Sequence, residues 1–344
     1  MRVLAALSGG VDSAVAAALL IEEGHEVVGA TMRLWRGARP DIGCCSEAEI
    51  DDARAVTRQL GIDHHVFNFT DEFDRAVVDP YVDGHAAGRT PNPCIACNRD
   101  LKFARFVHRA MALGFDAVAT GHHARVDRVG DRWALRRGAD AAKDQSYVLY
   151  VLGQDVLARC RFPVGSLTKA EVRARATQLG LRVADKPDSQ DACFVQTEGG
   201  RSAFLGSRIP LRPGRVLDAA TGAELGTVPS VELVTVGQRR GLVRGGGPRR
   251  YALSVDVDGG TVLVGEAAAT SVGEAEVVEW TWVSGAAPDD GTAVSVQTSA
   301  HGAPVPGVLE GRRVCFVEAH RRVAPGQAVV LYDADEVLGG GEAV

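Results

Sequence analysis

No run of apolar residues in this chain of 344 is long enough to span a membrane. The first residues, Met1-Arg2-Val3, lead directly into a predicted strand and show none of the layout of a signal peptide. The chain also lacks internal repeats and low-complexity tracts. These absences argue against a membrane protein, a secreted protein and a repeat array, so we expect a cytoplasmic protein with no membrane partner.

Positive charge is not in excess either. The formal net charge is −6, so an RNA partner would have to be bound by basic residues concentrated in one place. The composition, 46% hydrophobic and 24% charged, is that of an ordinary globular protein. Because 344 residues are many for a single core, we expect two or three domains.

An even set of cysteines, which would suggest a secreted disulfide framework, is missing. The chain has seven, an odd number, which favours thiol chemistry or metal binding. Adjacent cysteines rarely chelate one ion well. We therefore interpret Cys44 and Cys45 as structural, and Cys160 and Cys315 as simple packing residues.

A glycine loop, Ser8-Gly9-Gly10-Val11-Asp12-Ser13, separates the apolar run 3–7 from a predicted helix over 14–23. A strand, a glycine turn and a helix start together present backbone N–H groups and the positive end of a helix dipole to phosphate oxygens. Asp12 could orient a magnesium ion. No Lys follows the glycines, as a Walker loop would require. The loop predicts a pyrophosphate cradle; the alternative is a turn that merely joins strand to helix.

Strands and helices alternate through the first part of the chain. Further strands are predicted at 26–31, 65–69 and 117–120, and helices at 46–60, 99–113 and 168–179. The last of these helices begins with a capping box, Thr168 and Glu171. This alternation is typical of a parallel, doubly wound α/β sheet, whose ligands bind beyond the carboxyl ends of the strands. Gly9, Met32 and Gly121 follow three such ends.

From Arg212 onward, short β-rich runs are divided by turns. The runs 251–257 and 261–264, separated by Asp258-Gly259-Gly260, predict a hairpin. More strands are expected around 276–283, 293–297, 314–317 and 328–332. We therefore expect an α/β domain carrying the glycine loop over 1–205, a small β-rich domain over 206–269 and a C-terminal β-barrel over 270–344.

Two cysteines stand in polar motifs. Cys97, within the segment 92–98, is placed near the start of the predicted 99–113 helix, where the helix dipole favours thiolate. Cys193 lies in the polar loop 188–194, and reacting groups commonly lie on loops. Two reactive thiols together with a predicted pyrophosphate-binding loop indicate sulfur chemistry. The alternative is that both cysteines are small buried hydrophobic residues.

A series of motifs, each weak alone, occurs in a specific order along essentially the whole chain. They are the 8–13 loop, Gly29-Ala30-Thr31-Met32, Thr90-Pro91-Asn92-Pro93, Cys97-Asn98, Leu101-Lys102-Phe103, Thr120-Gly121-His122, Lys143-Asp144-Gln145-Ser146-Tyr147, Asp188-Ser189-Gln190, Cys193-Phe194, Thr235-Val236-Gly237-Gln238-Arg239, Pro325-Gly326-Gln327 and Leu338-Gly339-Gly340-Gly341. The loop resembles that of the ATP pyrophosphatases, and the whole chain resembles the tRNA-specific 2-thiouridylases of the MnmA type.

The resemblance implies an enzyme that replaces O2 of the wobble uridine, U34, in Lys, Glu and Gln tRNAs by sulfur. ATP, with Mg2+, adenylates that oxygen, and AMP and pyrophosphate are released. By this resemblance Cys193 receives sulfur as a persulfide, Cys97 frees it by forming a Cys97–Cys193 disulfide, and Asp12 is also catalytic. The implied sulfur donor is a cysteine desulfurase or a sulfur-relay protein, and we expect a monomer.

The same resemblance implies contacts residue by residue. Those to ATP are expected from Ala6, Leu7, Ser8, Gly9, Gly10, Val11, Asp12, Ser13, Met32 and Gly121. Those to tRNA are expected from Asn92, Pro93, Cys94, His122, Lys143, Asp144, Gln145 and Gln327. Residues 92–94 should line a pocket for the flipped, single-stranded target base.

Two positions depart from the family's pattern. Cys94 stands where the family commonly has Asp, which creates a Cys-x-x-Cys motif with Cys97. With Cys193, these thiols could hold an iron–sulfur cluster with one open iron, or a zinc ion. Gln297-Thr298 replaces an Arg-Tyr contact on a barrel strand, so that tRNA contact loses its basic side chain.

Two other classes of protein fit part of the sequence. Another ATP pyrophosphatase, an amidotransferase-type ligase acting on a carboxylate or nucleobase, would share the loop without needing Cys97 or Cys193. A non-catalytic RNA-binding or redox-sensing module would need neither Asp12 nor ATP.

Overall fold

The computed structural model describes residues 1–35, 47–188, 194–195, 199–243 and 248–344. Three of the cysteines, Cys44, Cys45 and Cys193, lie outside the described residues, as do Ser189 and Gln190. Within these ranges no helix has both the length and the apolar character needed to cross a membrane.

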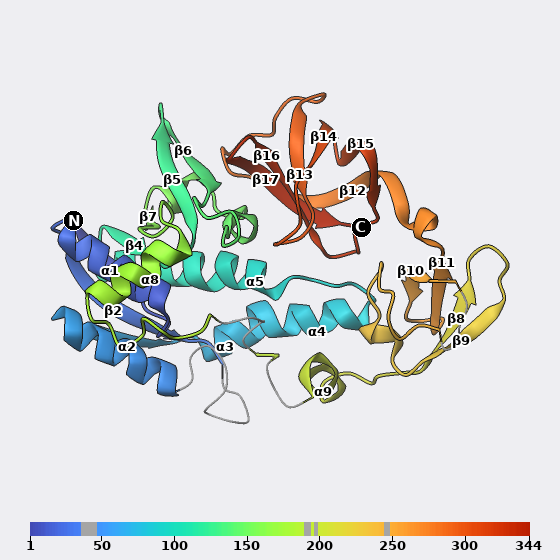
Figure 1. Ribbon diagram of the computed structural model, residues 1–344, viewed down its shortest axis with the longest axis horizontal. Helices are drawn as coiled ribbons and strands as arrows, with labels where there is room; N and C mark the ends of the chain where they lie inside the picture. The colour runs from blue at the N-terminus through green and yellow to red at the C-terminus, as the bar shows by residue number, and fades with distance from the viewer. Residues whose placement is uncertain (36–46, 189–193, 196–198, 244–247) are drawn as a thin grey trace.

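A parallel five-stranded sheet forms the first part of the molecule, in the order β3-β2-β1-β4-β7. Its strands are β1 (Arg2–Ala6), β2 (Glu26–Arg33), β3 (His64–Asn68), β4 (Ala117–Ala119) and β7 (Cys160–Arg161). Helices α1 (Val11–Glu22), α2 (Glu47–Leu60) and α8 (Lys169–Gln178) lie close to the sheet in Figure 1. The predicted doubly wound α/β fold is confirmed, because apolar strands separated by helices can bury both faces of a parallel sheet.

The helix predicted from Arg99 begins earlier, at Pro93. Three continuous elements make it: α5 (Pro93–Ala96), a π-helical stretch (Cys97–Arg105) and α6 (Phe106–Ala112). Asn92 caps the start, since its side-chain oxygen accepts a hydrogen bond from the Cys94 amide at 3.0 Å, and Pro93 suits the first helical position. Cys97 therefore lies one turn inside the helix rather than at its N-terminus. The effect of the helix dipole on its thiol is weaker there than at the N-terminus itself.

A smaller four-stranded sheet follows, in the order β10-β11-β8-β9. It consists of β8 (Gly214–Asp218), β9 (Glu224–Val228), β10 (Tyr251–Asp256) and β11 (Thr261–Gly265). The predicted hairpin is confirmed, since β10 and β11 pair in antiparallel fashion. The fully buried side chains of Val216, Val231, Val262 and Val264 form the centre of this domain's own core.

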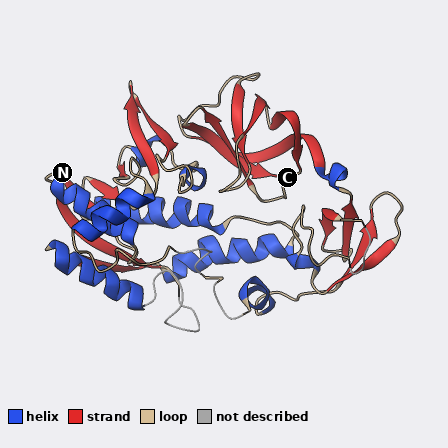
Figure 2. Ribbon diagram, viewed as in Figure 1, coloured by secondary structure: helices blue, strands red, loops and turns tan. Residues whose placement is uncertain are grey.

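The C-terminal part is a closed barrel, because β12 (Ser271–Trp282) pairs with both β15 (Arg313–Arg321) and β17 (Glu336–Ala343). Strands β13 (Ala293–Gln297), β14 (Val305–Glu310) and β16 (Ala328–Asp333) complete the ring. Figure 2 shows the barrel and the small sheet as the strand-rich parts, with long helices confined to the first domain.

A hairpin from the first domain reaches this barrel. Strands β5 (Ala124–Val129) and β6 (Arg132–Arg137) rise beside it in Figure 1, and β6 pairs with β17 through Arg136 and Glu336. No strands were predicted there from the sequence. The remaining short elements are α3 (Thr70–Phe73), a π-helical turn (Asp74–Val78), α4 (Asp79–Ala86), α7 (Gln154–Leu157), α9 (Gly200–Gly206) and 3-10 turns at Ser146–Leu149, Val231–Leu233 and Ala267–Thr270.

Candidate nucleotide and thiol site

The glycine motif Ser8–Ser13 follows the end of β1, as predicted, but α1 begins at Val11 rather than at residue 14, so the last three residues of the motif form the first turn of the helix. Inside it, the Ser13 hydroxyl donates to the Gly10 carbonyl at 3.0 Å and accepts from the Ser8 amide at 3.2 Å. Gly10 is the N-cap of α1 and contributes no side-chain cap. The first turn of this twelve-residue helix thus directs backbone N–H groups and the positive end of its dipole to the same side of the loop.

Two glycines are required by the packing of this loop. Gly9 has a φ of +74°, and a Cβ there would lie 2.5 Å from the Glu49 carbonyl oxygen. Gly121, just after β4, is packed against the start of α1, so that a Cβ would lie 2.5 Å from the Ser13 amide nitrogen. Met32 is at the end of β2. The structure therefore brings Gly9, Met32 and Gly121 to the carboxyl edge of three neighbouring strands.

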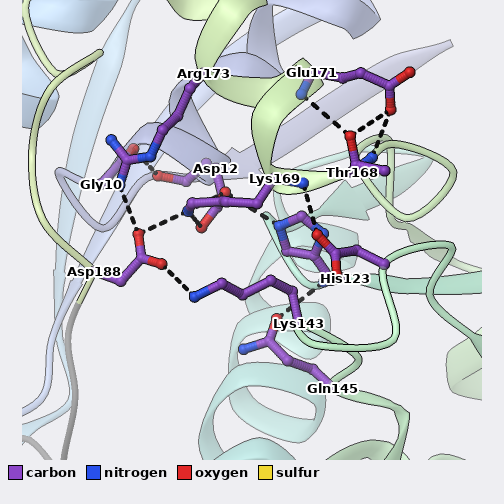
Figure 3. A network of polar contacts seen from close by, with 12 residues as sticks. Gly10, Asp12, His123, Lys143, Gln145, Thr168, Lys169, Glu171, Arg173 and Asp188 are labelled. Atoms are coloured by element: carbon purple, nitrogen blue, oxygen red, sulfur yellow. Dashed lines mark hydrogen bonds and ion pairs between the residues drawn. The ribbon is translucent and has the colours of Figure 1, made fainter.

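Asp12, in the first turn of α1, is the centre of a polar network (Figure 3). Both its carboxylate oxygens accept hydrogen bonds from Lys169 Nζ, at 2.7 and 2.8 Å, and His123 Nε2 lies 3.2 Å from Oδ1. Burial raises the pKa of the Asp12 carboxyl, but the hydrogen bonds from His123 and Lys169 outweigh it and leave this pKa below its ordinary value. Asp12 is therefore a charged carboxylate held by the Lys169 ammonium group and by the His123 ring.

Asp188 lies on the other side of Lys169. Its Oδ1 is 2.8 Å from Lys169 Nζ and 3.1 Å from Arg173 Nη2, and its Oδ2 accepts from Lys143 Nζ at 2.7 Å. Burial raises its pKa, but the hydrogen bonds from Lys143 and Lys169 lower it to about 2. The network thus joins Lys143, expected to contact tRNA, to Asp12 of the glycine loop.

Sequence reasoning missed Lys169, Arg173 and Asp188 as site residues. One signal was present: the capping box of Thr168 and Glu171, which the structure confirms, makes Lys169 the first residue of α8. What could not be predicted is that this helix start packs beside the glycine loop.

Two of the cysteines, Cys94 and Cys97, lie near the start of the helix that begins at Pro93. Cys94 is exposed, whereas Cys97 is 8% exposed and packs in a cluster with Phe73, Leu101 and Phe194. Cys193 lies outside the described residues, but Phe194, the next residue in the chain, belongs to the same cluster as Cys97. The two cysteine motifs, distant in the sequence, therefore meet in one part of the fold.

A pocket lies between this helix and the barrel. Asn92 and Pro93 line it together with Arg99 and Tyr150 of the first domain and Glu342 of β17. Cys94 and Cys97 are not among its lining residues. Two of the three residues expected to line a base pocket thus border a cavity, on a different part of the helix surface from the thiols.

Most of the other expected tRNA contacts are engaged within the protein. His122 is buried between Phe103 and Phe162, and burial holds its pKa well below its ordinary value. The carboxylate of Asp144 accepts from the Gly138 and Ser146 amides.

The remaining amides have similar internal roles. The Gln145 side chain accepts from the His123 amide at 2.9 Å, and Gln327 donates to the Thr90 carbonyl, which ties the barrel to the loop before Asn92. Gln297 is 3% exposed and accepts from Arg137 at 2.8 Å, while Thr298 lies 3.2 Å from His320.

The donor groups present limit where a metal ion could be held. In the described ranges no group of three His, Cys, Asp or Glu side chains could hold a metal ion. The carboxylates of Asp12 and Asp188 are already paired with ammonium groups and do not fit a protein-held magnesium site. The proposed cluster site at Cys94, Cys97 and Cys193 includes a residue outside the described ranges.

Three protein-family models match the chain. Residues 1–197 match the one described as tRNA methyl transferase HUP domain, and residues 202–266 the tRNA methyl transferase PRC-barrel domain. Residues 273–342 match the aminomethyltransferase beta-barrel domain.

Among characterised sequences, the chain is similar to proteins named tRNA-specific 2-thiouridylase MnmA. That of Mycobacteroides abscessus is 47% identical and covers 98% of each chain. That of Frankia casuarinae is 47% identical over 99% of this chain and 98% of its own, and that of Chloroflexus aurantiacus is 45% identical over 99% and 97%.

Similarity to solved structures is partial. A 4-thiouridine synthetase in complex with RNA and bound ATP gives a TM-score of 0.37 at 21% identity, over 56% of this chain and 44% of its own. NMN synthetase from Francisella tularensis gives 0.33 at 17%, over 55% and 66%. Scores this low bear on neither function nor substrate.

Proposed function

The chain belongs to the MnmA family of tRNA-specific 2-thiouridylases, and from that premise we propose that it catalyses the ATP-dependent 2-thiolation of the wobble uridine, U34, in Lys, Glu and Gln tRNAs. The observation that supports this most is similarity to proteins of that name along nearly the whole chain, rather than over one domain. The convergence of the glycine loop and the two cysteine motifs in one domain agrees with it.

In the first step the uridine O2 attacks the α-phosphorus of ATP, and pyrophosphate leaves. The loop Ser8–Ser13 provides backbone donors for the phosphates, while Ala6, Leu7, Met32 and Gly121 border the nucleotide at the carboxyl edge of the sheet. Magnesium enters as part of the Mg-ATP substrate, held by phosphate oxygens, because Asp12 and Asp188 are already paired with lysines. Adenylation turns a poor leaving oxygen into AMP.

In the second step a sulfur atom replaces that oxygen. Cys193 carries it as a persulfide received from a cysteine desulfurase or a sulfur-relay protein. The Cys97 thiolate attacks Cys193 Sγ, a disulfide forms, and hydrosulfide is released; the hydrosulfide attacks C2 of the uridine, and AMP leaves. An external dithiol then reduces the disulfide.

The tRNA would be bound along the surface that links the first domain to the barrel. In this proposal Lys143 exchanges its partner Asp188 for an RNA phosphate, and Asn92 and Pro93 border the pocket that receives an unstacked base. Asp144, Gln145, His122 and Gln327 support this surface from within. We also propose that the enzyme acts as a cytoplasmic monomer, with domains over 1–205, 206–269 and 270–344.

The test is mass spectrometry of nucleosides from unmodified Lys or Glu tRNA incubated with the enzyme, Mg-ATP and a persulfide source. We expect 2-thiouridine from the unchanged chain and from the control Cys315→Ser on the barrel, and none from Cys97→Ser or Cys193→Ser. Formation of 2-thiouridine by Cys193→Ser would overturn the persulfide assignment. Release of AMP without 2-thiouridine under any donor would identify another adenylating enzyme.

Asp12→Asn separates an enzyme from a binding module. We expect this variant to keep its affinity for tRNA and to lose AMP formation, because Asp12 holds Lys169 through two hydrogen bonds at the loop. Unchanged AMP formation in the variant would contradict a role for Asp12 in the reaction.

A further inference from the structure

The glycine loop lacks the lysine that phosphate-binding loops of the Walker type place directly after their glycines. Backbone N–H groups alone provide only partial positive charge. A departing pyrophosphate carries several negative charges, and a nearby cation stabilises it far more in a site from which water is excluded. Besides the magnesium ion that accompanies ATP, any further positive charge at the loop has to come from side chains of another part of the chain.

Two lysines approach the loop. Lys186 Nζ donates to the Gly9 carbonyl at 3.0 Å, but it is also held by Asp52 and Glu49 of α2, at 2.8 and 3.2 Å. It therefore fixes the loop against α2. Lys169 instead comes from α8 and reaches Asp12 in the first turn of α1, where the backbone N–H groups begin.

Lys169 is held by backbone contacts at the start of α8 as well as by ion pairs of its ammonium group. It is the first residue of α8, its backbone amide donates to Asp140 at 2.9 Å, and its side chain is only 11% exposed. Its ammonium nitrogen lies within 2.8 Å of carboxylate oxygens of both Asp12 and Asp188. Arg173, one turn along α8, contacts the same Asp188 oxygen at 3.1 Å. Two cations from one helix thus converge on one carboxylate.

The network also contains an unpaired buried polar atom. His123 is 2% exposed, its Nε2 faces Asp12, and its Nδ1 has no hydrogen-bond partner in the described part of the chain. A buried nitrogen without a partner is costly, so this atom of the network calls for an explanation.

We propose that Lys169 and Arg173 bind the β- and γ-phosphates of ATP and stabilise the departing pyrophosphate, and that Asp188 occupies the place of these phosphates in the empty enzyme. The inference rests on the ATP use in the proposed function. Phosphate oxygens entering beside the α1 N-terminus would be repelled by Asp188 and attracted by the two cations. The phosphates therefore take over Lys169 and Arg173, while Asp12 keeps its hold on the Lys169 ammonium from the loop side.

Calorimetric titration of the full chain with ATP, inorganic pyrophosphate and AMP tests this. Lys169→Met removes a charge-assisted contact, so we expect ATP and pyrophosphate to bind about 10- to 100-fold more weakly. AMP has neither the β- nor the γ-phosphate, so its affinity should remain within about twofold. Lys169→Arg should restore a large part of the affinity for ATP. The matched control is Arg175→Met on the same helix, which pairs with Glu22 away from the network and should bind all three ligands as the unchanged chain does.

Asp188→Asn gives a change of the opposite sign. Removing the competing carboxylate should tighten binding of pyrophosphate and ATP by about tenfold, again without changing AMP. Opposite shifts from two residues of one ion-pair cluster would not follow from misfolding. Equal weakening of ATP and AMP in Lys169→Met, or weaker ATP binding in Asp188→Asn, would overturn the proposal.

The titrations and the 2-thiouridine assay together separate failure of this phosphate-binding role from failure of the proposed 2-thiolation. Opposite ligand shifts with no 2-thiouridine would uphold the phosphate role in some other adenylating enzyme. Formation of 2-thiouridine by the unchanged chain, with Lys169→Met indistinguishable from it in all three titrations, would remove this inference alone. Failure of the unchanged chain to bind ATP at all would overturn both.

Discussion

Arg136 on β6 lies 2.6 Å from Asp335, in the turn between β16 and β17, although the two residues are 199 positions apart. Arg125 contacts the other oxygen of Asp335 at 2.7 Å, and Arg132 and Arg136 both contact Glu336. A hairpin of the first domain is therefore tied to the barrel by guanidinium–carboxylate pairs. These pairs join the barrel to the domain that carries the glycine loop, in addition to the apolar core that Tyr332 and Val337 share with Tyr147.

Arg136→Gln should weaken this tie. Because the pairs are partly exposed, we expect a loss of about 1 kcal/mol in the free energy of unfolding, smaller at high salt. Scanning calorimetry of the full chain measures it, with Arg128→Gln on the same hairpin as control. An equal loss in the control would show that the hairpin, rather than its contact with the barrel, was destabilised.

Gly121→Ala should distort the proposed nucleotide site, because Gly121 packs directly against the start of α1. The added Cβ would lie 2.5 Å from the Ser13 amide nitrogen and 2.7 Å from the Asp12 carbonyl carbon, both backbone atoms that cannot move aside without shifting the loop. We expect ATP affinity to fall at least about tenfold while tRNA affinity is retained. The control is Gly153→Ala, where a Cβ meets nothing within 4 Å. ATP binding by Gly121→Ala as tight as that of the control would contradict the packing argument.

Cys94→Ser distinguishes the two uses proposed for the cysteines. If sulfur is released by a disulfide between Cys97 and Cys193, the exposed Cys94 is dispensable, and the rate of 2-thiouridine formation should stay within about twofold. Nucleoside mass spectrometry measures the rate, and metal analysis of anaerobically purified protein measures iron. Loss of both activity and iron in this variant would favour the cluster instead.

His85 should make the fold sensitive to mild acid. It is 2% exposed, its ring lies 4.7 Å from that of Tyr81, and burial together with nearby Arg201 lowers its pKa to about 4. As the pH falls, His85 is protonated near pH 6.5 in the unfolded chain but only near pH 4 in the folded chain. The free energy of unfolding is therefore unaffected by His85 above pH 6.5, and it decreases by up to about 3 kcal/mol as the pH falls from 6.5 toward 4. Denaturant unfolding of His85→Phe across this range should show a shallower loss than the unchanged chain. The exposed His301→Phe serves as control, and identical slopes for both variants would contradict the prediction.

Local patterns in the sequence were enough for much of the fold. The capping box at Thr168 and Glu171 and the hairpin turn at Asp258-Gly259-Gly260 were predicted and are present, because each depends on a few neighbouring residues. The helix start at Pro93 was missed, although Asn92 and Pro93 are good N-cap and first-turn residues. The β5–β6 hairpin was missed because its arginines are balanced by acidic residues of the distant β16–β17 turn.

The sequence by itself determined the order of strands and helices, the glycine loop and the two cysteine motifs, since backbone sterics and hydrophobic periodicity act over a few residues. Only the tertiary structure decided which charges meet. Lys169 lies 157 positions from Asp12, and their contact exists because α8 packs beside α1 through Val172, Ala176 and Val15. The burial of those side chains, not any local signal, brings a cation to a glycine loop that has no lysine of its own.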